Sequence, residues 1–181
     1  MIVYTKDFLN HNLRGHPECR ERLSSTVDFL EAKGVFDKVR LTEPGRAEAE
    51  DILRVHSRGH FENMKGIAES GTQVLGDTYY NPESFETALL AAGAVKTCID
   101  SDSKAGFALV RPPGHHATKN ASMGFCIFNN VAVGAAYARA RGHEKIAILD
   151  FDIHHGNGTQ DIFYDDDILY ISLPQWPLRK G

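Results

Sequence analysis

Residues 145–157 read KIAILDFDIHHGN, an apolar run that ends in acids and histidines. A near-continuous apolar segment of this kind is typical of a strand buried on both faces of a parallel sheet. We therefore predict a strand over residues 145–152 that is covered on both faces. Because alternate side chains of a strand face the same way, Asp150, Asp152 and His154 should share one face at its carboxyl end.

Strands and helices are predicted to alternate on either side of this segment. Further apolar strands are expected over residues 2–4, 107–110 and 168–173. The spacing of apolar residues, with glycine or proline at the ends, predicts helices between them. This alternation indicates an α/β fold with a mostly parallel sheet, in one domain over residues 1–181. The helices are expected over residues 20–33, 47–56, about 61–67, 81–95 (opening on Asn81-Pro82) and 129–141.

Composition excludes several classes of function. The chain has 181 residues, a net charge of −4 and a pI near 6.1, so we expect no direct nucleic-acid binding. Three cysteines without CxxC spacing favour a reducing compartment over a disulfide framework. The first residues do not resemble a signal peptide and no apolar run is long enough to span a membrane. The expected location is the cytoplasm.

The acids and histidine after residue 148 predict a metal site. Asp150, Asp152 and His154 cannot share a buried face unless their charge is compensated. A divalent metal would compensate it, and an imidazole with carboxylates suits zinc. A solvated strand end with capping aspartates is the alternative, and the motif alone does not decide between them.

Two adjacent histidines, His115 and His116, follow the strand predicted at 107–110. They can act as a base and its partner, or they can belong to a polar turn in which one faces solvent. Both motifs follow the carboxyl ends of strands, which is the edge where ligands bind in open α/β sheets. We therefore expect both motifs to line one cleft.

Three long motifs together resemble the histone deacetylase superfamily, which includes acetylpolyamine amidohydrolases and acetoin-utilisation proteins. The resemblance implies an arginase-like three-layer α/β fold and hydrolysis of an acetyl-amine bond, in acetylated lysine, an acetylated polyamine or a similar acyl amine. Weaker similarities extend it at Gly15-His-Pro-Glu, Val55-His-Ser and Gly76-Asp-Thr-Tyr. The motifs are Arg111-Pro-Pro-Gly-His-His-Ala, Gly124-Phe-Cys-Ile-Phe-Asn-Asn and Leu149-Asp-Phe-Asp-Ile-His-His-Gly-Asn-Gly-Thr-Gln.

The resemblance also implies roles for individual residues. His116 is the expected general base, and asparagine as its partner should make it less basic than His115. Iron(II) can replace zinc at the same ligands. The implied roles are zinc ligands for Asp152 and His154, the tandem pair for His115 and His116, their partners for Asp150 and Asn157, substrate contacts for Gly124, Phe125, Asp77 and Arg20, and a structural potassium site for Asp150, Ser172 and Leu173.

The resemblance covers only the first part of the family's domain. In the family, the third zinc ligand and the oxyanion tyrosine lie beyond the last residue here, and later strands lie between the two that carry the motifs. We therefore expect a truncated fold, and either half of a split enzyme that a C-terminal half or another copy completes, or a non-catalytic fragment that keeps a partial metal site.

Overall fold

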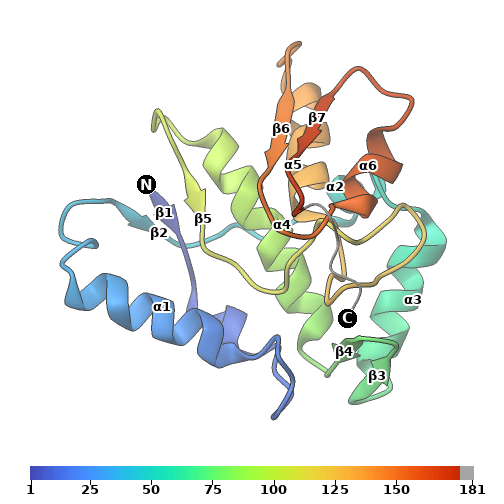
Figure 1. Cartoon of the computed structure of the whole chain (residues 1–181), viewed down its shortest axis with the longest axis horizontal. Helices are drawn as coiled ribbons and strands as arrows, with labels where there is room; N and C mark the ends of the chain where they lie inside the picture. The colour runs from blue at the N-terminus through green and yellow to red at the C-terminus, as the bar shows by residue number, and fades with distance from the viewer. Residues whose placement is uncertain (176–181) are drawn as a thin grey trace.

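The structure is a computed structural model that describes residues 1–175. Residues 176–181, the end of the predicted domain, lie outside the described residues. Strands and helices alternate along most of the chain (Figure 1). In order they are β1 (Ile2–Val3), η1 (Lys6–Leu9), α1 (Arg20–Ala32), β2 (Leu41–Thr42), α2 (Ala49–Leu53), α3 (Arg58–Glu69), β3 (Gln73–Leu75), β4 (Thr78–Tyr80), α4 (Ser84–Asp100), β5 (Phe107–Ala108), α5 (Asn130–Ala140), β6 (Ala147–Asp150), α6 (Asn157–Phe163) and β7 (Leu169–Ser172).

The strands form two parallel sheets and one antiparallel hairpin. One sheet has the order β2-β1-β5, and the other pairs β6 with β7. The hairpin joins β3 to β4. The predicted α/β class with parallel strands is confirmed. Among the described residues β5 and β6 have no hydrogen-bonded strand between them, so each keeps one unpaired edge.

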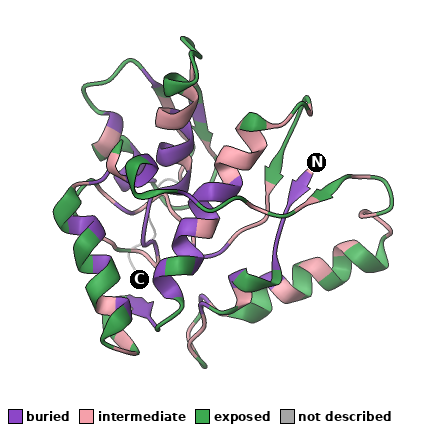
Figure 2. Ribbon diagram, turned by 180° about the vertical axis from the view of Figure 1, so that it is seen from behind, coloured by how far each residue is buried: buried purple, intermediate pink, exposed green. Residues whose placement is uncertain are grey.

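The helices α4 and α5 pack against each other and contribute much of the buried core. α4 packs against α5, β1 and β5, and its alanines are almost wholly buried, whereas α1 buries only Leu23 (Figure 2). Two glycines allow close approaches of α4: a Cβ on Gly134 of α5 would lie 2.3 Å from Val95, and a Cβ on Gly93 would lie 1.9 Å from the Gly45 carbonyl oxygen in the loop before α2. No helix within residues 1–175 has the length and apolar character needed to cross a membrane.

The strand that ends in the acidic motif differs from its prediction. β6 covers only Ala147–Asp150, and it is buried on one face rather than two. Ile148 is 7% exposed where it packs into the core, whereas its neighbour Leu149 is 56% exposed. Among the described residues, only one face of the β6–β7 pair is packed against other elements. The sequence predicted that both faces would be covered, and residues 1–175 do not cover the second face.

Other boundaries shift for local reasons. α4 begins at Ser84 rather than at Asn81-Pro82, because the Asn81 side-chain oxygen accepts hydrogen bonds from the Glu83 amide and the Ser84 hydroxyl in a preceding turn. β5 stops at Ala108 instead of residue 110. The glycines predicted to end helices do so with positive φ, at Gly34, Gly71 and Gly142.

Candidate active site

A cleft of about 410 Å³ lies where the chain leaves β5 and β6. The structure brings the tandem histidines and the acidic motif together in it, although they are about forty residues apart in the sequence. Five segments of chain contribute to its wall. The lining residues are Pro17, Glu18, Arg22, Asp77, Pro113, His115, His116, Gly124, Phe125, Asp152 and His154.

The two histidines have different partners behind them. His115 Nδ1 lies 2.9 Å from Asp150 Oδ2, a carboxylate oxygen that also accepts a hydrogen bond from the Tyr170 hydroxyl. His116 Nδ1 donates to Asn157 Oδ1 over 2.7 Å. An amide oxygen only accepts, so the proton sits on Nδ1 and the Nε2 of His116 is left as an acceptor. This arrangement suits His116 to take a proton.

The environment of His116 favours its neutral form. Burial lowers the pKa of His116, and the neighbouring rings of His115 and His154 lower it further. The hydrogen bond to Asn157 works in the opposite direction without reversing the shift. With its pKa below the ordinary histidine value, the ring is neutral at pH 7 and available as a base.

Asp152 and His154 reach the cleft from a loop and not from a strand, which corrects the prediction of a shared strand face. The Asp152 amide donates to Asp150 Oδ1 over 3.2 Å, and the His154 amide donates to Asp152 Oδ1 over 2.7 Å. These turns begin directly after β6 ends. Partial burial works to raise the pKa of Asp152, but the hydrogen bonds from His154 outweigh it and hold the pKa below its ordinary value.

A carboxylate and an imidazole are donors that suit zinc, but in this structure the His154 ring and the Asp152 carboxylate are hydrogen-bonded to each other. Asp152 Oδ1 and His154 Nδ1 are 3.0 Å apart. The number of donors falls short, because catalytic zinc sites use three protein ligands and residues 1–175 present no group of three His, Cys, Asp or Glu side chains arranged to hold a metal.

Gly124 and Phe125 form one wall in an unusual backbone conformation. Both have left-handed φ, at 57° and 67°. Their amides donate to Asp77 Oδ1 over 3.0 Å and to Thr78 Oγ1 over 3.1 Å, so the start of β4 holds them. A Cβ on Gly124 would lie 2.3 Å from the ring of His116. The predicted residues Gly124, Phe125 and Asp77 therefore sit together beside the histidine.

A buried ion pair supports the turn that carries the histidines. Arg111 donates from Nε to Glu18 Oε1 over 2.7 Å and from Nη2 to the Tyr79 hydroxyl over 2.9 Å. Arg111 is 3% exposed and Glu18 is fully buried. The sequence analysis gave these residues no role, although all three stand in quoted motifs: Glu18 in Gly15-His-Pro-Glu, Tyr79 in Gly76-Asp-Thr-Tyr and Arg111 at the start of Arg111-Pro-Pro-Gly-His-His-Ala.

Other predicted residues lie elsewhere. Arg20 does not line the cleft, whereas Arg22 does, with its guanidinium 3.6 Å from Glu18 Oε1. Ser172 Oγ lies 3.3 Å from His155 Nδ1, and the Leu173 amide donates to the Asp150 carbonyl over 2.8 Å. Ser172 and Leu173 are thus beside Asp150 but outside the cleft.

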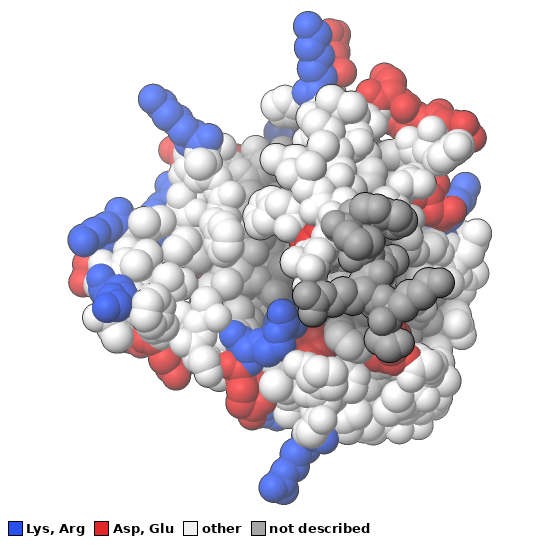
Figure 3. Space-filling model, in the orientation of Figure 1, with Lys and Arg blue, Asp and Glu red and all other residues white. Residues whose placement is uncertain are grey.

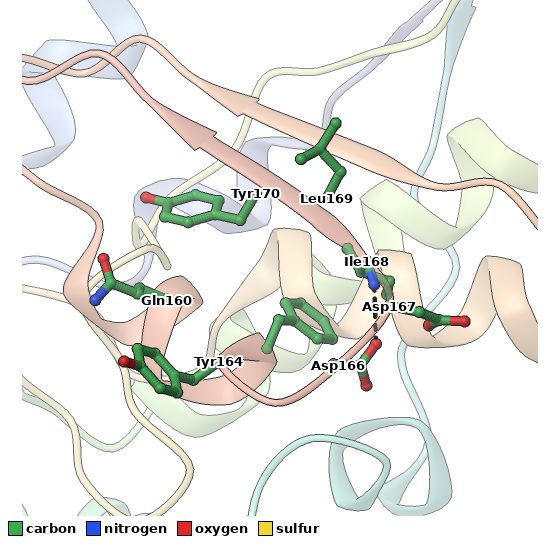
Figure 4. A pocket seen from close by; sticks show the side chains of 8 residues that line it. Gln160, Tyr164, Asp166, Asp167, Ile168, Leu169 and Tyr170 are labelled. Carbon is green, nitrogen blue, oxygen red and sulfur yellow. Dashed lines mark hydrogen bonds between the residues drawn. The ribbon is translucent and has the colours of Figure 1, made fainter.

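A second hollow lies between α6 and β7 (Figure 4). Its wall includes Gln160, Tyr164 and Leu169, and the Asp166 carboxylate there accepts the Ile168 amide over 3.0 Å. It contains none of the predicted site residues.

Comparisons with known proteins point to one family. Residues 16–179 match the family model described as the histone deacetylase domain. The chain is 42% identical to a probable deacetylase of Archaeoglobus fulgidus, over 99% of this chain and 52% of that protein. It is 42% identical to a histone deacetylase-like amidohydrolase of Pseudomonas aeruginosa, over 89% of this chain and 44% of that protein.

A solved structure supports the same assignment. The crystal structure of the HDA15 HD domain superposes with a TM-score of 0.88 at 36% identity, over 96% of this chain and 52% of that one. The chain thus spans about half the length of the relatives it matches, which agrees with the expected N-terminal half.

Proposed function

The chain belongs to the histone deacetylase domain family, and on that premise we propose that it supplies the proton-transfer half of a site that hydrolyses an acyl-amine bond. The observation that carries the proposal is the pair of histidines with unlike partners, facing Asp152 and His154 across one cleft. Each partner suits one proton-transfer task.

His116 is the proposed general base. Its Nε2 faces the cleft without a proton, since Nδ1 is committed to Asn157. It would take a proton from the attacking water. His115, backed by the Asp150 carboxylate, is better placed to hold the positive charge of an imidazolium and to return a proton to the leaving amine.

Asp152 and His154 are the proposed zinc ligands, with iron(II) as a possible replacement. Bound there, the metal would supply Lewis acidity to the amide carbonyl and to a water molecule. The third ligand and the oxyanion donor would come from outside residues 1–175. Asp150, Ser172 and Leu173 stay a proposed potassium site.

The proposed substrate is an acetylated lysine, an acetylated polyamine or a similar acyl amine. Gly124 and Phe125 would form the wall along the acyl chain, because they stand directly beside His116. Asp77 would contact the substrate at the rim. Among the arginines near the cleft, Arg22 lines it and is the better candidate than Arg20.

The experiment measures acetate release from an acetyl-lysine peptide by the zinc-loaded chain, alone and with the second half of a relative. We expect His116→Ala to abolish release and His143→Ala, which changes an exposed histidine, to leave it unchanged. A folded sample that binds zinc and releases no acetate in either condition would refute the proposal.

One observation favours a second candidate function. The described residues supply two metal donors rather than three, as expected of a fragment that binds metal without catalysis. Such a fragment would bind zinc through Asp152 and His154, and turnover would be absent even after the second half is added.

A further inference from the structure

The side-chain amide of Asn157 determines which nitrogen of His116 carries the proton. An amide has two ends of similar shape, an oxygen that accepts hydrogen bonds and an NH2 group that donates them. With the oxygen toward His116, the ring is protonated on Nδ1 and keeps Nε2 free. With the NH2 group toward the ring, Nδ1 has to accept, so the proton moves to Nε2 and the ring cannot act as a base.

The backbone around Asn157 is packed against the turn that carries the tandem histidines. The Thr159 amide donates to the His115 carbonyl over 3.1 Å. A Cβ on Gly158 would lie 2.3 Å from the Ala117 carbonyl oxygen. These contacts fix the position of Asn157 relative to the histidines. They do not fix the rotation of its amide, because the last side-chain torsion of asparagine has two broad and nearly equivalent settings.

The other end of the amide contacts a methionine. Asn157 Nδ2 donates to Met123 Sδ over 3.4 Å, while Oδ1 accepts from His116 Nδ1 over 2.7 Å. Among the described residues, these are the two hydrogen-bond partners of the Asn157 side chain. A thioether sulfur accepts hydrogen bonds and has no proton to donate. It therefore favours the rotation in which the NH2 group faces Met123 and the oxygen faces His116.

Met123 is anchored by its neighbours in the chain. Its carbonyl accepts the Cys126 amide over 2.9 Å, which closes the tight turn of the cleft wall. Ser122, directly before it, is hydrogen-bonded to the Tyr80 hydroxyl. The sulfur therefore contacts Asn157 from a segment that is held on both sides.

Solvent cannot make the same selection between the two rotations. Met123 is 39% exposed, so water would replace its sulfur if the side chain were shortened. A water molecule donates as readily as it accepts, and it can pair with either end of an amide. The property that selects one rotation is therefore the inability of the thioether to donate a hydrogen bond, and not its bulk.

We propose that Met123 is a positioning residue, whose sulfur orients the Asn157 amide and thereby keeps the proton of His116 on Nδ1. Met123 does not line the cleft itself, so it acts only through Asn157. This role rests on the proposed function, because it concerns His116 as the general base.

The test compares a hydrogen-bond acceptor with an apolar side chain at position 123. Met123→Glu supplies a carboxylate, which only accepts, whereas Met123→Leu keeps an apolar side chain of similar volume without an acceptor. If Met123 acts by packing, leucine is the mild change and glutamate is the disruptive one. If Met123 acts as an acceptor, the order of the two effects is reversed.

The readout is the ¹⁵N chemical shifts of the His116 ring in the full chain, at a pH where the ring is neutral. These shifts distinguish a protonated Nδ1 from an unprotonated one. We expect the ratio of the Nδ1–H form to the Nε2–H form to fall about fivefold in Met123→Leu, as for the loss of one hydrogen bond. The ratio should be kept in Met123→Glu. Met64→Leu, the same substitution at a buried methionine of α3, should leave it unchanged.

Backbone amide spectra show whether each variant is folded. If Met123→Leu does not fold, Met123→Ala replaces it with the same expected fall, because water then takes the place of the sulfur. An unchanged ratio without the sulfur would overturn the proposal, and so would a fall in Met123→Glu as large as that in Met123→Leu. The measurement needs neither metal nor substrate, so a chain that releases no acetate would refute the proposed function without deciding this result.

Discussion

At the scale of single residues, the contrast between His115 and His116 comes from the atom that faces each Nδ1. A carboxylate oxygen of Asp150 brings a negative charge to the Nδ1 of His115, whereas the amide oxygen of Asn157 orients the His116 ring without adding one. The distinction is one of charge and not of distance, because both contacts are within hydrogen-bond range.

Replacing Asn157 with aspartate should raise the pKa of His116. A carboxylate in contact with Nδ1 favours the imidazolium, and a rise of about one pKa unit corresponds to about 1.4 kcal/mol. Titration of the ring by NMR measures it directly. Asn63→Asp, at an exposed site on α3, should leave the pKa where it is. If the pKa of His116 is the same in Asn157→Asp as in the unaltered chain, the group at position 157 does not set the protonation of His116.

Adding a methyl group at Gly124 should displace the His116 ring. The new Cβ would lie 2.3 Å from it and in a left-handed backbone, so we expect a loss of about a hundredfold in acetate release by the reconstituted enzyme. Gly76→Ala is the matched control, because its φ is +64° and no atom lies within 4 Å of the added Cβ. Gly76→Ala should lower the free energy of unfolding by about 1–2 kcal/mol, because alanine is strained in a left-handed backbone conformation, and it should leave acetate release unchanged. Equal effects of the two changes on the His116 NMR signals would argue against a steric role for Gly124.

At the scale of helices and strands, local sequence predicted the correct type for each element that it identified, but it missed β2, β3, β4 and α6 and predicted the wrong coverage for β6. Glycines such as Gly34 end helices for a backbone reason that the sequence displays. The apolar run of β6 shows only that its side chains need cover, and not which part of the chain supplies it. The Glu18–Arg111 pair was equally invisible, because its partners are separated by 93 positions.

The tandem histidines and the acidic motif were predicted to meet because both follow strand ends, and they do meet. The predicted local structure was wrong in one respect: Asp152 and His154 lie on turns after β6, and not on the strand itself. Hydrogen bonds from backbone amides to the preceding aspartates create those turns, and alternation along a strand cannot anticipate them.

Two helical glycines should respond to alanine with opposite signs. Gly93→Ala places a Cβ 1.9 Å from the Gly45 carbonyl oxygen across the contact between α4 and its neighbouring loop, and should destabilise the fold by about 3 kcal/mol. Gly66→Ala in α3 meets nothing within 4 Å and should stabilise it by about 0.5–1 kcal/mol. Urea unfolding of both variants measures the difference. A stabilising Gly93→Ala would contradict the packing described here.

At the scale of the whole molecule, two neutral histidines tie the stability of the fold to pH. Burial lowers the pKa of His11 to about 3 and that of His56 to about 4. His11 bonds to Ser84, and His56 bonds to the Thr118 carbonyl and accepts the Asn129 amide. Protonation of either ring therefore opposes folding.

Stability should fall on acidification from pH 7 to pH 5. Both folded-state pKa values lie below the unfolded value near 6.5, so the stabilisation is complete above pH 6.5 and is lost as pH falls toward the folded values. Each histidine contributes a loss of about 2 kcal/mol over this range. Urea unfolding at the two pH values measures the sum. The exposed-site variant His143→Gln should show the same loss, and a stability that does not change with pH would exclude buried neutral rings.

The exposed apolar side chains of β6 and β7, Leu149, Leu169 and Ile171, also bear on aggregation. In the orientation of Figure 1, the surface over these two strands is largely free of charged side chains (Figure 3). Residues 168–173, ILYISL, form an uncharged β-prone stretch of the kind that seeds cross-β aggregates. Three aspartates, Asp165, Asp166 and Asp167, stand immediately before it, and Pro174 follows it. Charges and proline at the borders of such a stretch act as gatekeepers against intermolecular strand pairing. β7, which exposes Leu169 and Ile171, thus carries in its flanks a protection against intermolecular strand pairing.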